Sequence, residues 1–203
     1  MSQDAIARPE DDHGEVTEGF RPAEGLVRAT QRLEQQDALD PLVRLYARVA
    51  GPVDRSPWSG LLRADLVGHA LHPVLTDVPL GCWTAATVLD LRGREGDRQA
   101  SRTLVAVGLA AVAPTALTGF AEWARTGHEL RRVGAAHAAL NALATSLYAV
   151  SLVARHRGRH GLGTATALAG ASVAGVSGYL GGHLTTARKV GSRAPEFAAD
   201  AVS

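Results

Sequence analysis

Four long apolar stretches fill most of the chain beyond residue 70, at about residues 74–91, 103–121, 133–154 and 162–184. Each is close to the roughly 20 residues that a helix needs to span a bilayer. Arginines gather in the short connections between these stretches and are absent from their interiors. Such exclusion of charge is typical of hydrocarbon surroundings, whereas a soluble bundle carries charges at every turn. We therefore predict an all-α protein with a four-helix transmembrane bundle over residues 61–191.

The apolar stretches are rich in Ala, Gly, Ser and Thr rather than Leu, which suits membrane helices that pack closely. Gly178 and Gly182, and likewise Gly134 and Ala138, place small residues one turn apart. Pro114 is expected to kink the second helix. A soluble Ala-rich bundle is the alternative, and three tryptophans at predicted helix edges count against it: Trp58, Trp83 and Trp123.

The region before the bundle has two parts. Residues 1–24 are acidic and lack apolar periodicity, so we expect a disordered tail, and we expect the same of residues 192–203. Residues 25–60 predict an amphipathic helical segment, in which Asp40 caps a helix and Pro41 takes its first position. One face of this helix is apolar, and the opposite face carries Arg44 and Arg48. The helix either lies on anionic lipid or packs on its own domain.

Charge and cysteine content narrow the possible classes of protein. The formal net charge is +1, and the basic residues lie between the apolar stretches, so no nucleic-acid partner is expected. Cys82 is alone, which excludes disulfides and Cys-based metal clusters within one chain. The acidic N-terminus does not resemble a cleaved signal peptide. We expect a multi-pass protein of the cell membrane with both termini in the cytoplasm, although the arginine distribution does not decide the orientation.

Four alternating helices bring distant polar residues to one face of the membrane. The first helix starts, the second ends, the third starts and the fourth ends there. An ionisable group inside a membrane helix costs roughly 2.5–3.5 kcal/mol on insertion scales, so such residues usually have a partner or a purpose. The candidate ligands are His69, His72, His137 and His183, and Asp77, Glu122 and Asn141 are expected to surround and position them.

These side chains allow cofactor chemistry as well as plainer structural roles. Imidazoles from two helices can ligate haem iron axially, and His with Asp or Glu can bind zinc, iron or manganese. Alternatively, His69 and His72 hydrogen-bond backbone groups at a helix end, Asp77 is a helix cap, and Glu122 pairs with an arginine. His137 is the strongest candidate because it falls inside an apolar run, but a hydrogen bond to Asn141 would also satisfy it.

The chain resembles an uncharacterised bacterial family of four-helix membrane domains, often fused to or encoded with a Rieske-type ferredoxin domain. The resemblance covers about residues 30–190. The stretches that carry it are 68–83 (GHALHPVLTDVPLGCW), 118–123 (TGFAEW), 137–141 (HAALN) and 178–183 (GYLGGH). The chain departs from the family pattern at Ala70, at Glu122 and after His183. It has no Rieske motif, so the resemblance implies a separate ferredoxin partner. It implies the fold but no established activity.

Three functional hypotheses follow. The first is an integral membrane component of electron transfer that holds haem b or a divalent metal through the candidate histidines. The second is a non-catalytic membrane scaffold in which the polar groups serve helix packing. The third is a pathway for a small solute or protons, and an enzyme with its own turnover is the least supported. The expected partners are the lipid bilayer and a Rieske-type ferredoxin, and the oligomeric state is left open.

Overall fold

A computed structural model describes residues 24–192 and 194 of the chain. Three short helices come first, α1 (Glu24–Glu34), α2 (Asp40–Arg55) and α3 (Ser59–Leu62). Four long helices follow: α4 (His72–Arg92), α5 (Arg98–Trp123), α6 (His128–His156) and α7 (His160–Gly182). The 3-10 turns η1 (Asp37–Leu39), η2 (Asp65–Val67) and η3 (Glu95–Asp97) precede α2, α4 and α5, and a π turn, η4 (His183–Ala187), extends α7. This confirms the predicted all-α class for the described range.

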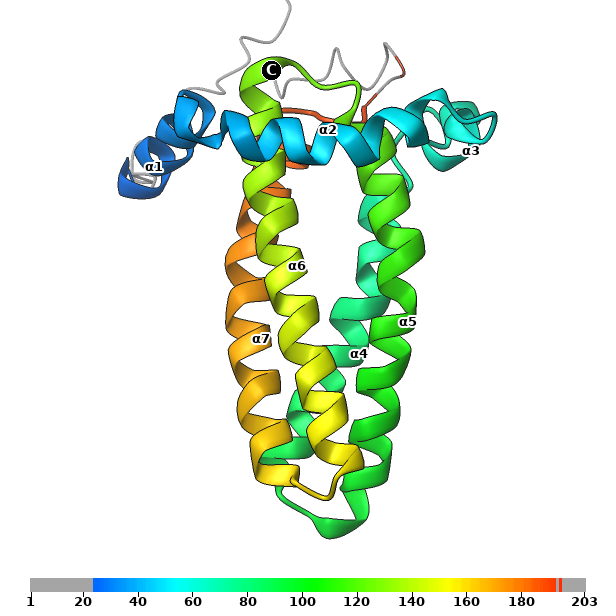
Figure 1. Ribbon diagram of the computed structural model, residues 1–203, viewed down its shortest axis with the longest axis vertical. Helices are drawn as coiled ribbons and strands as arrows, with labels where there is room; N and C mark the ends of the chain where they lie inside the picture. The colour runs from blue at the N-terminus through cyan, green and yellow to red at the C-terminus, as the bar shows by residue number, and fades with distance from the viewer. Residues whose placement is uncertain (1–23, 193, 195–203) are drawn as a thin grey trace, which may run out of the picture.

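The four long helices run side by side, and α2 lies across one end of them (Figure 1). α4 packs chiefly against α5, and α6 chiefly against α7, so the bundle consists of two helical hairpins. α1 and α3 project beyond the bundle on either side (Figure 1). The predicted tails, residues 1–24 and 192–203, lie outside the described residues except for Glu24, Ser192 and Ala194.

Three of the long helical segments are long and apolar enough to cross a membrane: His72–Arg92, Glu95–Trp123 and His128–His156. α7 is not among them, because its many Gly, Ser and Thr residues lower its mean hydropathy. The described residues thus contain three candidate spans where four were predicted. α5 continues as a helix through Pro114.

The long helices carry many large apolar side chains on their outer surface, and several polar side chains lie inside among the apolar core residues, unlike the arrangement in a soluble bundle. The exposed large apolar residues of the long helices include Val74, Val78, Val88, Leu91, Val107, Leu117, Leu143, Val150, Val153, Leu162, Leu168 and Val176. The buried polar residues include Ser101, Thr115, Thr118, Ser151, Arg155 and Ser177. An apolar outer surface has no favourable contact with water, so this distribution favours lipid around the long helices.

An aromatic pair forms the centre of the bundle. The rings of Trp83 from α4 and Tyr148 from α6 stack with their centroids 4.0 Å apart. Each ring lies against a glycine of the neighbouring helix, Trp83 against Gly108 and Tyr148 against Gly170. A Cβ at Gly108 would lie 2.3 Å from Trp83 Nε1, so this position requires a residue without a side chain. The glycines let the rings meet in the middle of the bundle.

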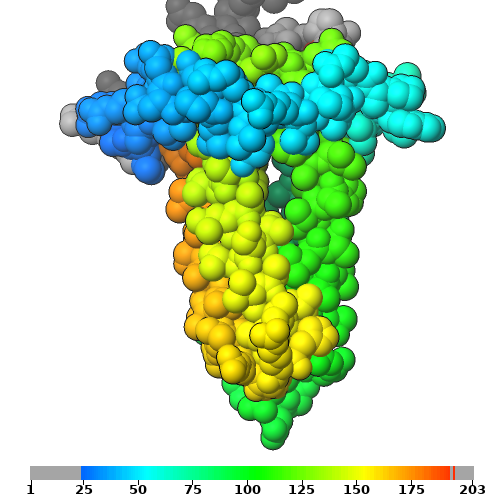
Figure 2. All heavy atoms as spheres, in the orientation of Figure 1, coloured from blue at the N-terminus to red at the C-terminus, as the bar shows by residue number. Residues whose placement is uncertain are grey.

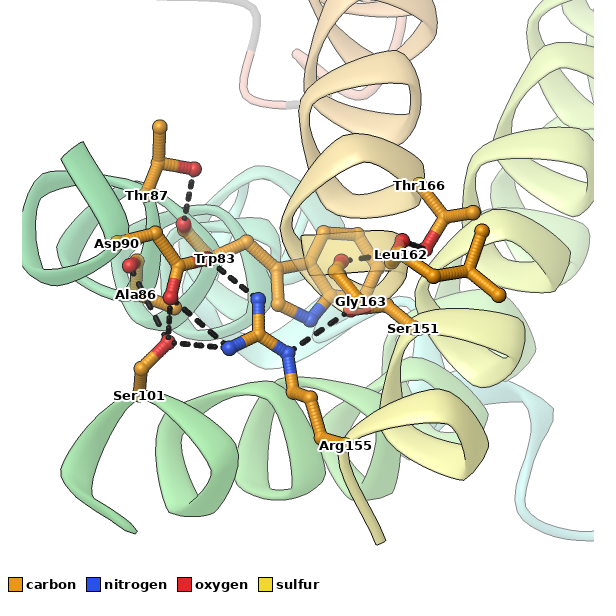
Figure 3. Close-up of polar contacts among 10 residues, drawn as sticks. All are labelled: Trp83, Ala86, Thr87, Asp90, Ser101, Ser151, Arg155, Leu162, Gly163 and Thr166. Atoms are coloured by element: carbon orange, nitrogen blue, oxygen red, sulfur yellow. Dashed lines mark hydrogen bonds and ion pairs between the residues drawn. The ribbon is translucent and has the colours of Figure 1, made fainter. Parts of the chain in front are cut away.

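A buried ion pair joins the hairpins near the end opposite α2 (Figure 3). The Arg155 guanidinium of α6 pairs with the Asp90 carboxylate of α4, and the exposed fractions of the two side chains are 1% and 6%. Ser101 of α5 donates to Asp90 at 2.7 Å and accepts from Arg155 at 3.0 Å. Arg155 Nε also donates to Ser151 at 3.0 Å. Both charges therefore have several partners, as buried charges require.

Ion pairs attach α1 and α2 to the opposite end of the bundle. Arg132, near the start of α6, pairs with Asp37 and with Asp40, whose Oδ1 lies 2.7 Å from Arg132 Nε. The prediction that Asp40 caps α2 is wrong, because the N-cap residue is Leu39 and the Asp40 carboxylate binds Arg132 instead. Val43 and Ala50 of α2 are buried in a cluster with Trp123 and Ala135. This contact supports packing of α2 on its own domain.

We predict that Arg155→Ala strongly destabilises the protein, because it leaves Asp90 buried without its counter-charge. Breaking a buried pair in this way costs about 3–5 kcal/mol. Thermal unfolding of the detergent-solubilised protein should show a clear fall in Tm, and Asp90→Ala in the same chain should recover part of it. The matched control is Arg157→Ala, since Arg157 is exposed two residues away. Equal Tm values for the two single variants would contradict the prediction.

Candidate functional site

A cavity of about 430 Å³ lies between the two hairpins, next to α2. Figure 2 shows the hollow below α2, between α5 and α6. Its walls are mostly small or apolar residues of α5, α6 and α7, and the polar groups on them include His72, His137, Asn141 and Glu122. The volume and the mainly apolar lining are those of a small-molecule or cofactor pocket.

His72, the first residue of α4, is fixed on the neighbouring helix of its hairpin. Its Nδ1 lies 2.9 Å from the backbone oxygen of Thr115, and since a carbonyl oxygen only accepts, Nδ1 carries the proton. The ring lies against Gly119, where a Cβ would be 2.8 Å from Cε1. Nε2 has no hydrogen-bond partner among the residues that the structure describes. The His72 lone pair is therefore available to a ligand.

His137 is held in the same way by the second hairpin. Its Nδ1 donates to the backbone oxygen of Ser177 at 2.8 Å, and its ring lies against Gly181. Asn141, one turn further along α6, donates to Nε2 at 3.0 Å, and its Oδ1 accepts from Ser177 Oγ at 3.0 Å. The spacing of four residues predicts that His137 and Asn141 point the same way, and this hydrogen bond confirms it.

His72 and His137 face each other across the cavity region. Their ring centroids are 6.3 Å apart and the ring planes are perpendicular. Both Nδ1 atoms donate to backbone carbonyls, which fixes the tautomer and leaves the Nε2 lone pair as the acceptor on each ring. A backbone carbonyl behind the imidazole is also the usual support of a metal-ligating histidine. The arrangement thus brings together two imidazoles of the same tautomer from two hairpins, and Nε2 of His137 is the one that accepts from Asn141.

The other two candidate histidines lie elsewhere and do not line the cavity. His69 is exposed just before α4, and its backbone pairs with Ser192 in a single β-bridge. His183, at the start of η4, lies 2.8 Å from the carboxylate of Glu34 in α1. The structure therefore brings together two of the four predicted histidines, His72 and His137.

The two predicted carboxylates also separate. Asp77 is exposed on α4 and does not line the cavity. Glu122 is buried at the end of α5 and does line it. Hydrogen bonding to Asp65 raises the pKa of Arg63, and the charges of Asp54 and Glu122 raise it further. Arg63 is thus an arginine whose charge interacts with Glu122.

Among the described residues, no group of three or more His, Cys, Asp or Glu side chains is placed to hold a metal ion. Structural zinc sites use four protein ligands and catalytic zinc sites use three, so the pair of imidazoles does not suit zinc. Haem iron, in contrast, needs only one or two axial ligands from the protein. Of the cofactors considered from the sequence, haem is the one whose number of protein ligands matches two neighbouring imidazoles.

The residues that hold the hairpins together in the middle of the bundle are not evident from the sequence pattern. The arginine-rich connections predict a solvent-facing Arg155, yet it is buried and paired with Asp90 of α4. Tyr148 was not singled out, although it stacks on Trp83. The available signal was the charge of Arg155 together with the aromatic ring two turns before it, on the same face of α6.

Glu34 provides a pH test of how α1 is attached. The hydrogen bonds from Arg188, at 2.5 and 2.7 Å, lower the pKa of Glu34 below its ordinary value of 4.5, and His183 lowers it further, against a smaller opposing effect of burial. The attachment should be complete above that value and lost as the pH falls through the lowered pKa.

We expect hydrogen exchange in residues 24–34 to accelerate in that acidic range and to be slow near neutral pH. Glu34→Gln should exchange faster than wild type at neutral pH and lose most of this acid dependence. Identical pH profiles for the two proteins would contradict the assignment.

The comparison with protein families agrees with this architecture. A family described as "Predicted membrane protein (DUF2231)" matches residues 68–194, which include all four long helices. No curated protein and no solved structure matches the chain significantly. The association with a Rieske-type ferredoxin stays a prediction. Because the family match covers more than half of the sequence, the chain belongs to this family of predicted membrane proteins.

Proposed function

We propose that this membrane protein holds a haem between its two hairpins and serves as an electron-transfer component, with His72 and His137 as the axial ligands. The observation that carries the proposal is the pair of perpendicular imidazoles 6.3 Å apart, each anchored through Nδ1 on a backbone carbonyl. When bound, a haem with two imidazole ligands supplies one-electron chemistry at iron.

The spacing of the rings supports this assignment. Two imidazoles on opposite sides of one metal ion, with metal–nitrogen bonds of about 2.1 Å, have ring centres about 6 Å apart. The observed separation of 6.3 Å agrees with that distance. The adjoining cavity is mainly apolar, as a porphyrin requires, and Glu122 and Asn141 are its polar groups near the ligands. Ligation at His137 would replace the hydrogen bond from Asn141.

We further propose that all four long helices cross the bilayer. α7 is 23 residues long, packs along α6, and ends beside His137 of α6, toward the end of the bundle that α2 crosses (Figure 1). A helix packed on a membrane-spanning neighbour needs less apolar surface of its own, because part of its surface faces protein. Four crossings put α1, α2 and both termini on one side, for which we retain the cytoplasmic orientation.

The scaffold hypothesis is favoured by one observation, the complete hydrogen-bonding of His137. Its two ring nitrogens already contact Ser177 and Asn141, so this residue is satisfied without any cofactor. A purely structural role of His72 is less well supported, since its Nε2 has no partner among the described residues. The two hypotheses differ in whether the protein carries a chromophore.

We expect the protein purified from haem-replete membranes to show a Soret band and about one haem per chain. His72→Ala and His137→Ala should each abolish or shift the band, because each removes one axial ligand. The matched control is His69→Ala, which changes a histidine three residues from His72 that lies outside the cavity. That variant should keep the wild-type spectrum.

Asn141→Ala tests the competing hydrogen bond at the same site. It removes the donor to His137 Nε2 and keeps both imidazoles, so its haem content should be at least that of wild type. A colourless, metal-free and stable wild-type protein would overturn the haem assignment and favour the scaffold.

The four-crossing proposal predicts the accessibility of tags in intact cells. A tag in the loop 157–159 should lie on the side of the membrane opposite to tags at residue 126 and at the C-terminus. If α7 stays outside the bilayer, the C-terminal tag will instead lie on the same side as the tag at 157–159. Protease protection in cells and in inverted vesicles distinguishes the two arrangements.

A further inference from the structure

The two hairpins carry equivalent residues along their first helices. Along the sequence, the number of residues from His72 to His137 is the same as that from Trp83 to Tyr148 and from Asp90 to Arg155. The buried positions of the two helices correspond in the same way. Pro79, Trp83 and Ala86 are buried in α4. The residues at the same interval in α6 are also buried: Ala144, Tyr148 and Ser151. α4 and α6 therefore present one pattern of inward positions.

The second helices show the same relation at a slightly shorter interval. The buried positions of α5 include Ser101, Val105, Gly108, Thr115 and Thr118. Their equivalents in α7 at that constant interval are Gly163, Ala167, Gly170, Ser177 and Leu180, and all five are buried. The change of interval between the two pairs of helices falls in the loops, where the α6–α7 connection is shorter than the α4–α5 connection.

The contacts within each hairpin are equivalent as well. His72 donates to Thr115 O and lies on Gly119, as His137 donates to Ser177 O and lies on Gly181. Trp83 lies on Gly108 as Tyr148 lies on Gly170.

A hydroxyl bridges the equivalent backbone positions near the other end of each hairpin. Ser101 Oγ of α5 lies 3.3 Å from Ala86 O, with which it shares the proton that it donates to Asp90 at 2.7 Å, and Ser151 of α6 donates to Gly163 O at 2.6 Å. The serine has moved from the second helix to the first, while the bonded pair of positions stays the same.

We infer that the chain contains two copies of one helical hairpin, and that the surface between them is a two-fold interface running along the bundle. Equivalent residues meet across it at three levels, as His72 with His137, Trp83 with Tyr148, and Asp90 with Arg155. Such mutual contact of equivalent positions is the signature of an isologous interface. The partner that each hairpin surface fits is therefore another copy of the same hairpin.

The repeat also bears on the ligand site, in a step that rests on the proposed function. The two imidazoles occupy equivalent positions, so a single central metal would meet them as equivalent ligands. The residue one turn after each histidine differs. Thr76 donates its hydroxyl proton to His72 O, whereas Asn141 donates to His137 Nε2. Asn141 is thus the point at which the two halves of the site differ.

The relocated hydroxyl gives a test that involves no cofactor. In the full-length protein, Ser101→Gly removes the bridging hydroxyl of the first hairpin together with its hydrogen bonds to Asp90 and Arg155, and it should lower the Tm in detergent. Adding Ala86→Ser recreates the arrangement of Ser151 and Gly163, so the double variant should regain part of the loss. The control is Ala85→Ser with Ser101→Gly, in which the serine lies one residue away on an exposed position and should restore nothing.

A second variant covers the case in which the serine introduced by Ala86→Ser packs badly. Exchanging the aromatic pair by Trp83→Tyr with Tyr148→Trp keeps one indole and one phenol at the interface, each on a glycine. The double variant should be more stable than the sum of the single effects predicts. The inference is overturned if the serine double variant is no more stable than Ser101→Gly and the aromatic effects are additive. These Tm values do not depend on haem, so they stand even if no Soret band is found.

Discussion

Side chains of α4 and α6 that meet in the middle of the bundle join the two hairpins, whose backbones pack through α5 with α6 and through α4 with α7. A bilayer interior offers no water to satisfy charges or hydroxyl groups, so the polar residues of the long helices must find partners inside the protein. Asp90 and Arg155 do so with each other and with Ser101, near one end. The stacked Trp83 and Tyr148 add an apolar contact beside them. Together they close one end of the bundle and leave the cavity between the hairpins at the other.

The open end is completed by α1 and α2. The pairs of Arg132 with Asp40 and of Glu34 with Arg188 fasten this segment to α6 and to the residues after α7. Tyr46 of α2 lines the cavity, so the segment is both a cover and part of the wall. The polar groups of the site thus lie beside α2 in a mainly apolar cavity.

Much of the fold could be predicted because it depends on local pattern. The arginine-rich connections marked the ends of the long helices, and His137 was conspicuous inside an apolar run. The hydrogen bond between His137 and Asn141 could be predicted from their spacing along one helix, whereas partners on different elements could not, since they depend on which helix faces lie together. His183 meets Glu34 from a segment far away in the sequence, and Arg155 turns inward although it lies at a helix end. The membrane crossing of α7 was predicted from length, but its small and hydroxyl-bearing residues leave it below the hydropathy of the other spans.

The buried ion pair has a consequence for how such a bundle could arise. If two identical hairpins associated as separate chains, the position of Asp90 would face another aspartate, and that of Arg155 another arginine. Like charges buried at one spot repel each other strongly where water is excluded. Joining both hairpins in one gene allows the two positions to change independently, so that one became an acid and the other a base. The charge complementarity that joins the halves therefore depends on their having different sequences, as they do within this one chain.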